Sequence, residues 1–398
     1  YSSAASDVYK RQYGYNSFHF DITKYLKPGE KNTLAVRLEN LPESSRWYPG
    51  AGLYRNVHLI ITEDAYIPVW GTYITTPSVN EKFAKVNVRT KVVLPEGADP
   101  AKYSVETSVW NPNKQKLTAV RTSLAQMKYN NNQAEQEFVI QAPSLWSPEM
   151  PALYSAETRL YEGDKLKDIY TTPFGIRSIE IIPDKGFFLN GKRTVFKGVC
   201  NHHDLGPLGA AVNDAAIRRQ IRILKDMGCN AIRTSHNMPA PELIRACDEM
   251  GMMIMAESFD EWNVAKCKNG YNLLFDEWAE KDLVNLLHNF RNNPSVVMWC
   301  IGNEVPNQWN EGDCKIAKWL QDICHREDPT RPVTQGMDAP DAVVNNNFAA
   351  VMDVAGFNYR PFKYKINYKK LPQRIVLGSE TASTVSSRGV YKFPVERK

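Results

Sequence analysis

The strongest constraint on the fold is a repeated alternation of short apolar runs and amphipathic stretches in the second half of the chain. From about residue 187 onward, the apolar runs have the length and composition of buried strands, and they cover residues 194–199, 230–235, 252–257, 295–301, 351–357 and 374–378. Between them, residues 215–227 and 241–250 carry apolar side chains at helical spacing, and a Gly that suits a helix C-cap follows each stretch. Such repeats predict a parallel sheet, either doubly wound or closed into a (β/α)8 barrel.

Polar clusters at the ends of successive strands decide between these two folds. They stand at residues 201–204 (NHHD), 233–236 (RTSH), 257–262 (ESFDEW), 302–304 (GNE), 334–335 (TQ), 358–360 (NYR) and 379–381 (SET). In a barrel, the C-terminal ends of all strands converge on one mouth, where catalytic groups lie. A doubly wound sheet usually carries a glycine-rich phosphate loop, and neither GxGxxG nor GxxxxGK[ST] occurs. We therefore predict a TIM barrel over residues 181–398 that lacks its last βα unit.

The first half of the chain has the period-two pattern of antiparallel strands. Residues 85–93 and 103–110 alternate apolar and polar side chains, and so do residues 33–38 and 57–62. We divide this half into an immunoglobulin-like β-sandwich over residues 66–180 and, over residues 13–65, the C-terminal part of a jelly-roll β-sandwich of the sugar-binding type. Residues 1–12 match nothing that follows and are interpreted as a leader that is not native. We expect a multidomain chain that is truncated at both ends.

Charge and hydropathy exclude two classes of partner. Lys and Arg number 49 against 44 Asp and Glu, and no basic block concentrates the excess, so nucleic acid is not expected to bind. No apolar run approaches the ~18 residues that would cross a bilayer, so no membrane span is expected.

Two carboxylates stand out among the polar clusters. Glu304 ends the fourth strand of the barrel and Glu380 ends the seventh, so both belong to the predicted mouth. A carboxylate at the end of an apolar strand is costly unless it is paired or functional. Two carboxyl groups that face each other across a barrel mouth suit glycoside hydrolysis. The alternative for Glu380 is a structural carboxylate paired with Arg.

The motifs of the chain resemble those of glycoside hydrolase family 2, in family order. The segments that carry the likeness are residues 46–55 (RWYPGAGLYR), 188–192 (FLNGK), 198–204 (GVCNHHD), 232–236 (IRTSH) and 301–305 (IGNEV). The resemblance implies a retaining exo-β-glycosidase, most similar to β-galactosidases, with an oligosaccharide or other glycoside as its substrate. We expect the 46–55 motif to brace a domain interface.

The resemblance also implies roles for single residues. Glu304 matches the acid/base, Glu380 the nucleophile, and Asn303 the residue that hydrogen-bonds the sugar 2-hydroxyl. Tyr359 matches a donor to the nucleophile carboxylate, and Arg233 a residue that braces it. Further matches contact sugar hydroxyls, and they are His202, Asp204 and His236. Because strand residues alternate in direction, only one of His202 and His203 is expected to face the mouth.

Several alternatives stay open beside this assignment. Glu257 and Asp260 are either supporting ligands of the site or helix caps, and Trp262 and Trp299 are either core aromatics or sugar platforms. No metal or other cofactor is expected to be required. A divalent cation near Glu261 is the alternative, although Asn263 stands where the related magnesium site has a His.

The function also has alternatives. Within the family, the main one is a β-glucuronidase or a member of another sugar specificity. Outside it, the chain could be a non-catalytic carbohydrate-binding protein or an inactive truncated fragment, since an unclosed barrel exposes two strand edges. A homo-oligomer is open for the full-length protein.

Overall fold

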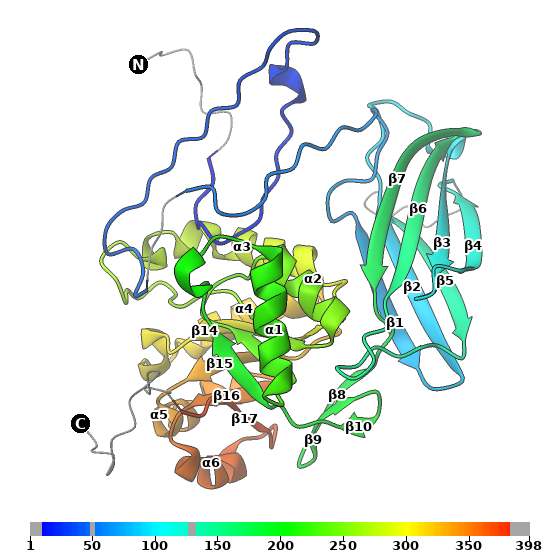
Figure 1. Ribbon diagram of the computed structural model, residues 1–398. Coiled ribbons are helices and arrows are strands. Elements are labelled where there is room, and N and C mark those ends of the chain that lie inside the picture. Colours follow the sequence, from blue (N-terminus) through cyan, green and yellow to red (C-terminus); the bar gives the residue numbers. More distant parts are fainter. Residues whose placement is uncertain (1–9, 48–51, 126–132, 383–398) are drawn as a thin grey trace.

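The computed structural model describes residues 10–47, 52–125 and 133–382. Its main parts are a β-sandwich and a curled parallel sheet covered by helices, with an extended N-terminal segment lying across the helical part (Figure 1). Within the described residues, no helix is both long enough and apolar enough to cross a membrane.

The sandwich consists of two antiparallel sheets. One has the order β1-β2-β5 and the other the order β4-β3-β6-β7. The strands are β1 (Thr72–Val79), β2 (Phe83–Lys91), β3 (Tyr103–Trp110), β4 (Lys116–Ser123), β5 (Gln133–Gln141), β6 (Tyr154–Glu162) and β7 (Lys165–Phe174). In β5, buried and exposed residues alternate, so that Phe138 and Ile140 enter the core while Glu137 and Val139 face outward. The β-sandwich predicted from this alternation is confirmed.

A small antiparallel sheet connects the sandwich to the barrel (Figure 1). Its strands are β8 (Ile179–Ile182), β9 (Gly186–Leu189) and β10 (Lys192–Arg193). Ile181 of this sheet and Phe196, which follows it, pack against Met298, Val354 and Ile375 inside the curled sheet. These apolar side chains fill the interior of the barrel away from the strand ends that carry the polar clusters.

The predicted incomplete TIM barrel is confirmed. In the part of the chain that the structure describes, seven parallel strands pair in chain order, and β11 and β17 form the two edges of the sheet. The strands are β11 (Gly198–Asn201), β12 (Ala231–Thr234), β13 (Met253–Glu257), β14 (Val296–Asn303), β15 (Val333–Met337), β16 (Val354–Asn358) and β17 (Val376–Glu380). The sheet curls until the Cys200 thiol of β11 donates to the Ser379 carbonyl of β17 at 3.3 Å.

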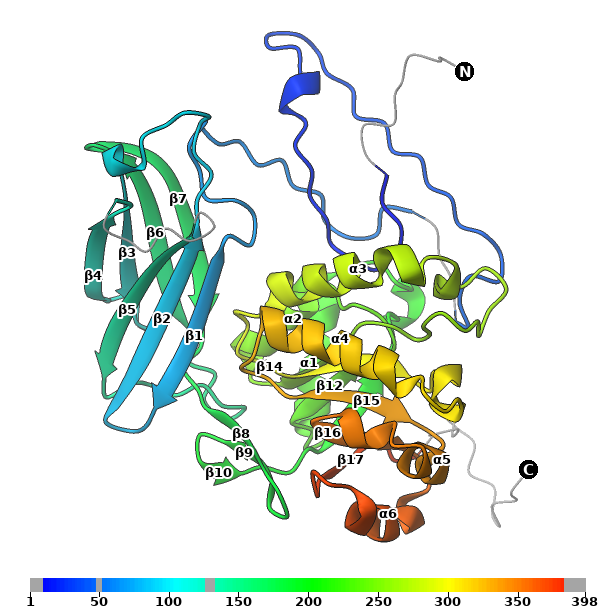
Figure 2. The same ribbon diagram turned by 180° about the vertical axis from the view of Figure 1, so that it is seen from behind.

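Helices cover the outer face of the curled sheet (Figure 2). They are α1 (Asp214–Asp226), α2 (Pro241–Met250), α3 (Phe275–Phe290), α4 (Cys314–Glu327), α5 (Pro340–Asn345) and α6 (Tyr364–Lys370). The Asn213 side chain caps α1 by accepting from the Ala216 N–H, and α2 ends at Gly251, whose φ of 73° is left-handed as predicted. One continuous apolar core lies between helices and strands, and it includes Ile221, Ile254 and Phe357.

The strands predicted at residues 33–38 and 57–62 are not formed. Within residues 10–47 and 52–65, the structure has extended chain and one 3-10 helix, Thr23–Tyr25, but no strand. Leu34 and Ile61 of these runs are 64% and 85% exposed. Alternation shows which side chains could share a face, but a strand also needs a partner for its N–H and C=O groups, and no described segment pairs with these runs.

Candidate active site

The C-terminal ends of the barrel strands bring most of the predicted residues together. Arg233 comes from β12, Glu257 from β13, Asn303 and Glu304 from the end of β14, and Glu380 from β17. At Glu304 the backbone turns with a φ of 42°, and its N–H still donates to the Gly336 carbonyl of β15 at 2.7 Å. The strand therefore ends at this residue while its backbone stays tied to the neighbouring strand.

Tyr359 repeats this arrangement at the end of β16. Its φ is 56°, and its N–H donates to the Glu380 carbonyl of β17. Left-handed backbone is uncommon for residues with a Cβ and collects at functional sites. Both side chains thus leave their strands at the same rim of the sheet.

The Glu380 carboxylate is held by two donors. Arg233 Nη1 donates to its Oε1 at 2.6 Å, and the Tyr359 hydroxyl donates to its Oε2 at 2.6 Å. His236 Nε2 lies 3.4 Å from the same Oε1. Burial alone would favour the neutral acid, but the Arg233 cation and the Tyr359 hydrogen bond outweigh it and hold the pKa of Glu380 below its ordinary value. Glu380 is therefore more readily ionised than an ordinary glutamate.

Arg233 is the hub of the buried polar network. Besides Glu380, its Nη2 donates to Asn303 Oδ1 at 3.0 Å, and its Nε lies 2.5 Å from Glu257 Oε2. Glu257 is fully buried, and its Oε1 lies 2.7 Å from His236 Nδ1. Glu257 therefore contacts both the arginine and the histidine that flank Glu380.

Glu304 has the opposite environment. Its Oε1 accepts one hydrogen bond, from Asn358 Nδ2 at 2.9 Å, while Asn358 Oδ1 accepts from the Ser379 hydroxyl at 2.7 Å. Burial raises the pKa of Glu304 above its ordinary value, the negative charges of Asp338 and Glu380 add to the effect, and the Asn358 hydrogen bond opposes it. Glu304 therefore retains a proton more readily than a solvent-exposed glutamate.

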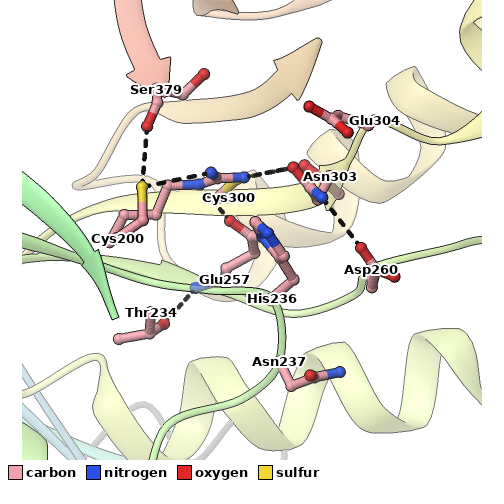
Figure 3. A network of polar contacts seen from close by, with 12 residues as sticks. Cys200, Thr234, His236, Asn237, Glu257, Asp260, Cys300, Asn303, Glu304 and Ser379 are labelled. Carbon is pink, nitrogen blue, oxygen red and sulfur yellow. Dashed lines mark hydrogen bonds and ion pairs between the residues drawn. The ribbon is translucent and has the colours of Figure 1, made fainter. Parts of the chain in front are cut away.

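Asn303 and Asp260 lie side by side beneath Glu304 (Figure 3). Asn303 Nδ2 donates to Asp260 Oδ1 at 3.0 Å. Arg46 of the N-terminal segment donates to both oxygens of Asp260, at 2.9 and 2.7 Å, and Lys266 Nζ lies 3.0 Å from Oδ1. Burial works against the charge of Asp260, but these cations lower its pKa to about 2. The carboxylate of Asp260 is thus bonded to Asn303, Arg46 and Lys266 and does not cap a helix.

The two adjacent histidines separate as expected. His202 is exposed, and its ring lies 5.1 Å from that of His236, centroid to centroid. His203 stacks on Tyr15 at 5.0 Å, and burial lowers its pKa to about 3. His202 is therefore the one that lies beside the polar network, and His203 belongs to the scaffold.

Asp204 is the predicted site residue that the structure does not bring into the network. Its side chain is exposed, and its Oδ1 accepts from the Gly206 N–H at 2.8 Å. The carboxylate closes a local turn after β11. The sequence pattern placed it at a strand end but could not show that the chain bends away directly after His203.

The surroundings of Glu261 do not fit a cation. Its Oε2 accepts from the N–H groups of Lys266 and Cys267 at 2.6 and 3.3 Å, and its Oε1 accepts from the Asn272 N–H at 3.0 Å. The carboxylate thus organises the loop after β13, and main-chain donors occupy the positions that a metal would take. Across residues 10–47, 52–125 and 133–382, no group of three or more His, Cys, Asp or Glu is arranged to hold a metal ion.

Several contributing residues were missed by the sequence reasoning. Asn358 and Ser379 stood inside recognised clusters, but only the tertiary structure brings Asn358 to Glu304 and Ser379 to Asn358. Lys266 lies in the loop after β13, where the sequence shows neither apolar periodicity nor a strand-end polar cluster. Trp47 packs its ring 4.8 and 5.0 Å from those of His202 and His236. The sequence left open whether Trp262 and Trp299 are core aromatics or sugar platforms. Both are fully buried core residues and not sugar platforms.

The N-terminal segment is anchored to the barrel beside the site. Arg55 donates to the Met238 and Pro239 carbonyls at 2.6 and 3.2 Å, as expected of a motif that braces an interface. Arg46, at the other end of the same motif, reaches Asp260. The segment therefore contributes to the shape of the mouth.

The geometry supplies the two groups that acid-assisted displacement needs. A cation and a hydroxyl lower the pKa of one carboxyl group, Glu380, while burial and nearby anions raise the pKa of the other, Glu304. Two titratable groups whose environments push their pKa values apart are the mark of an acid–nucleophile pair.

Known proteins share both the sequence and the fold. A β-galactosidase, BoGH2A of Bacteroides ovatus, is 39% identical over 97% of this chain and 49% of its own length. A β-glucuronidase of Bacteroides fragilis is 31% identical over 81% of this chain and 48% of its own length. The crystal structure of a glycosyl hydrolase family 2 member from Bacteroides cellulosilyticus superposes with a TM-score of 0.83 at 36% identity, over 92% of this chain and 47% of that one. The chain spans about half the length of these two curated relatives.

Two family models cover the described domains. Residues 66–177 match Glycosyl hydrolases family 2, and residues 180–395 match Glycosyl hydrolases family 2, TIM barrel domain. The second match alone takes in more than half of the chain, and it contains Arg233, Glu304 and Glu380. The chain therefore belongs to glycoside hydrolase family 2.

Proposed function

We propose that the protein carrying this chain is a retaining exo-β-glycosidase, with Glu380 as nucleophile and Glu304 as acid/base. The observation that carries the proposal is the contrast between the two carboxyl groups: the pKa of Glu380 lies below its ordinary value and that of Glu304 above it. Retaining glycosidases need this pairing, with the two groups about 5–5.5 Å apart.

The first step of the proposed reaction forms a glycosyl-enzyme. Glu304 gives its proton to the glycosidic oxygen while a Glu380 oxygen bonds to the anomeric carbon, and the alcohol leaves. Asn303 donates to the sugar 2-hydroxyl, and His236 and His202 lie where they can bind further hydroxyls. The Tyr359 hydroxyl and Arg233 keep the nucleophile ionised and oriented until attack.

The second step reverses the role of Glu304. Once Glu380 is glycosylated its negative charge is gone, so one of the charges that raise the pKa of Glu304 disappears. Glu304, now ionised, takes a proton from water as the water oxygen bonds to the anomeric carbon. The Glu380 carboxylate leaves, and the sugar is released with its original anomeric configuration.

A terminal β-galactoside is the substrate we propose first, because the β-galactosidase of B. ovatus is 39% identical over 97% of the chain. A β-glucuronide is the second candidate, since the β-glucuronidase of B. fragilis shares 31% identity over 81% of it. The two sugars differ at two positions: the 4-hydroxyl is axial in the galactoside and equatorial in the glucuronide, and carbon 6 is a hydroxymethyl group in the first and a carboxylate in the second. Discrimination between them therefore rests on contacts to carbons 4 and 6, not on the acid–nucleophile pair.

The experiment is a substrate screen with stereochemical analysis of the product. The complete protein is assayed with the nitrophenyl β-galactoside, β-glucuronide and β-mannoside, and NMR follows the first sugar anomer released. We expect turnover of one of the three with the β-anomer appearing first. Release of the α-anomer first would contradict the retaining mechanism. If the protein binds sugar but hydrolyses none of the three glycosides, a carbohydrate-binding protein would be favoured.

A further inference from the structure

We propose that Arg46, Asp260 and Lys266 form a positioning unit that fixes Asn303 at both ends, so that one amide N–H of Asn303 points at the sugar 2-hydroxyl. These three residues are called the clamp triad. The inference rests on the proposed function for the identity of the hydroxyl. It assigns to the clamp triad no direct contact with substrate.

The amide of Asn303 has only one orientation that its neighbours accept. Its Oδ1 accepts from Arg233 Nη2 at 3.0 Å and from Asn358 Nδ2 at 3.1 Å, while its Nδ2 donates to Asp260 at 3.0 Å. A flipped amide would set N–H against two N–H donors and its oxygen against a carboxylate. Since an amide nitrogen carries two N–H groups and Asp260 engages one, the second is left for a ligand.

Lys266 holds the other end of the same residue. Its Nζ donates to the Asn303 backbone carbonyl at 2.6 Å and also lies 3.0 Å from Asp260 Oδ1. The ammonium therefore joins the main chain at the end of β14 to the carboxylate that binds the Asn303 side chain. Asn303 itself is only 1% exposed, so it cannot settle into another rotamer without breaking these contacts.

Arg46 keeps the carboxylate in place. Two parallel N–H···O bonds fix both the position and the plane of Asp260, which a single contact with Lys266 would not do. Arg46 belongs to the N-terminal segment, outside the barrel, and its neighbour Trp47 packs against His202 and His236. The orientation of a substrate-binding amide in the barrel is thus set partly by another part of the chain.

The test compares two substrates that differ only in the 2-hydroxyl. The variants Asp260→Asn and Arg46→Met are assayed in the complete protein with the preferred nitrophenyl glycoside and its 2-deoxy counterpart. With the substrate that has the 2-hydroxyl, we expect kcat/KM to fall about 10- to 100-fold, because hydrogen bonds to this hydroxyl strengthen in the transition state. With the 2-deoxy substrate, kcat/KM of the variants and of the unchanged protein should differ by less than about threefold, because the Asn303 amide then has no hydroxyl to bind.

The chain offers a matched control at the opposite end of the barrel strands. Arg374 donates through Nε to Asp184 Oδ1 at 2.8 Å, and its Nη2 lies 2.8 Å from the same oxygen. Asp184→Asn and Arg374→Met make the same chemical changes in a pair that is remote from the mouth. Both control variants should leave unchanged the ratio of kcat/KM for the glycoside to kcat/KM for its 2-deoxy counterpart.

Two further measurements distinguish a role of Asp260 in folding from a role in positioning Asn303. If Asp260 acts through Asn303, the double variant Asp260→Asn with Asn303→Ala should lose no more activity than Asn303→Ala alone. A crystal structure of Asp260→Asn should show the Asn303 amide rotated or in two conformations. The proposal would be overturned by equal losses of kcat/KM on both substrates or by additive losses in the double variant. It would also be overturned by an Asn303 amide that keeps its orientation in the Asp260→Asn crystal structure.

Failure of the proposed function would look different. If the unchanged protein turns over no glycoside, the glycosidase assignment falls, and the Asn303 orientation in the Asp260→Asn crystal structure still decides whether the clamp triad positions it. If the unchanged protein is active and the Asn303 amide stays in place in that variant, the clamp triad fails while the glycosidase stands.

Discussion

Arg233 Nη1 lies 2.6 Å from Glu380 Oε1, and the same guanidinium also contacts Glu257 and Asn303. One buried cation thus connects the predicted nucleophile to the residue beside the predicted acid/base. Its planar array of donors suits three partners in fixed directions, which a lysine could not serve. The charge of Glu380 therefore depends on a strand-end arginine that also binds Asn303, the neighbour of Glu304 in the chain.

Tyr359→Phe should move one limb of the pH profile. Loss of the hydroxyl removes a hydrogen bond that lowers the pKa of Glu380, so this pKa rises. Because the nucleophile must be ionised, the acidic limb of kcat/KM should shift to higher pH, and the measurement is kcat/KM across the acidic and neutral range. Tyr368→Phe, which removes a hydroxyl bonded to Asp184, is the control. An acidic limb that stays in place would argue against Glu380 as nucleophile.

Glu304→Gln should make the rate depend on the leaving group. An amide cannot protonate the departing oxygen, so hydrolysis of a disaccharide should slow by about 10²- to 10⁴-fold. A nitrophenyl glycoside needs little protonation and should form the glycosyl-enzyme at a rate close to that of the unchanged protein, as pre-steady-state kinetics would measure. Equal slowing of this step for both substrates would remove Glu304 from the acid role.

Glu380→Ala should abolish turnover and respond to azide. The missing carboxylate leaves room for a small anion, which can attack the anomeric carbon from the face opposite the leaving group and give the α-glycosyl azide. Glu304→Ala is the matched variant, because there azide replaces water in the second step and should give the β-glycosyl azide. NMR of the two products distinguishes the roles, and identical products would show that the roles are misassigned.

Gly336→Ala should disturb the site through a single methyl group. A Cβ at this position of β15 would lie 2.6 Å from Arg233 Nη2, 3.0 Å from Asn358 Oδ1 and 3.2 Å from Asn303 Oδ1. Overpacking of this kind costs about 1–3 kcal/mol of stability. Displacement of the network should lower kcat/KM by about 10²-fold. Gly14→Ala, which meets no atom within 4 Å, is the control, and thermal unfolding is measured beside activity.

Part of the site could be predicted because its signal is local. A buried parallel strand is apolar on both faces, so a Glu or Arg at its end is visible in the sequence, and a barrel brings all such ends to one rim. Arg233, Glu304 and Glu380 were found in this way. For Asp204 this reasoning did not predict the contacts, because a strand-end position does not show in which direction the following turn carries a side chain.

What the sequence determined by itself was therefore the alternation of elements in the sandwich and the barrel and the residues that end the barrel strands, since periodicity and strand-end polarity depend on near neighbours along the chain. Only the tertiary structure decided which side chains meet: Asn358 with Glu304, Arg46 and Lys266 with Asp260, and Trp47 with His202. It also decided that residues 33–38 and 57–62 are not strands. The physical reason is the same in each case, because contacts between distant segments depend on register and on a partner that no local pattern encodes.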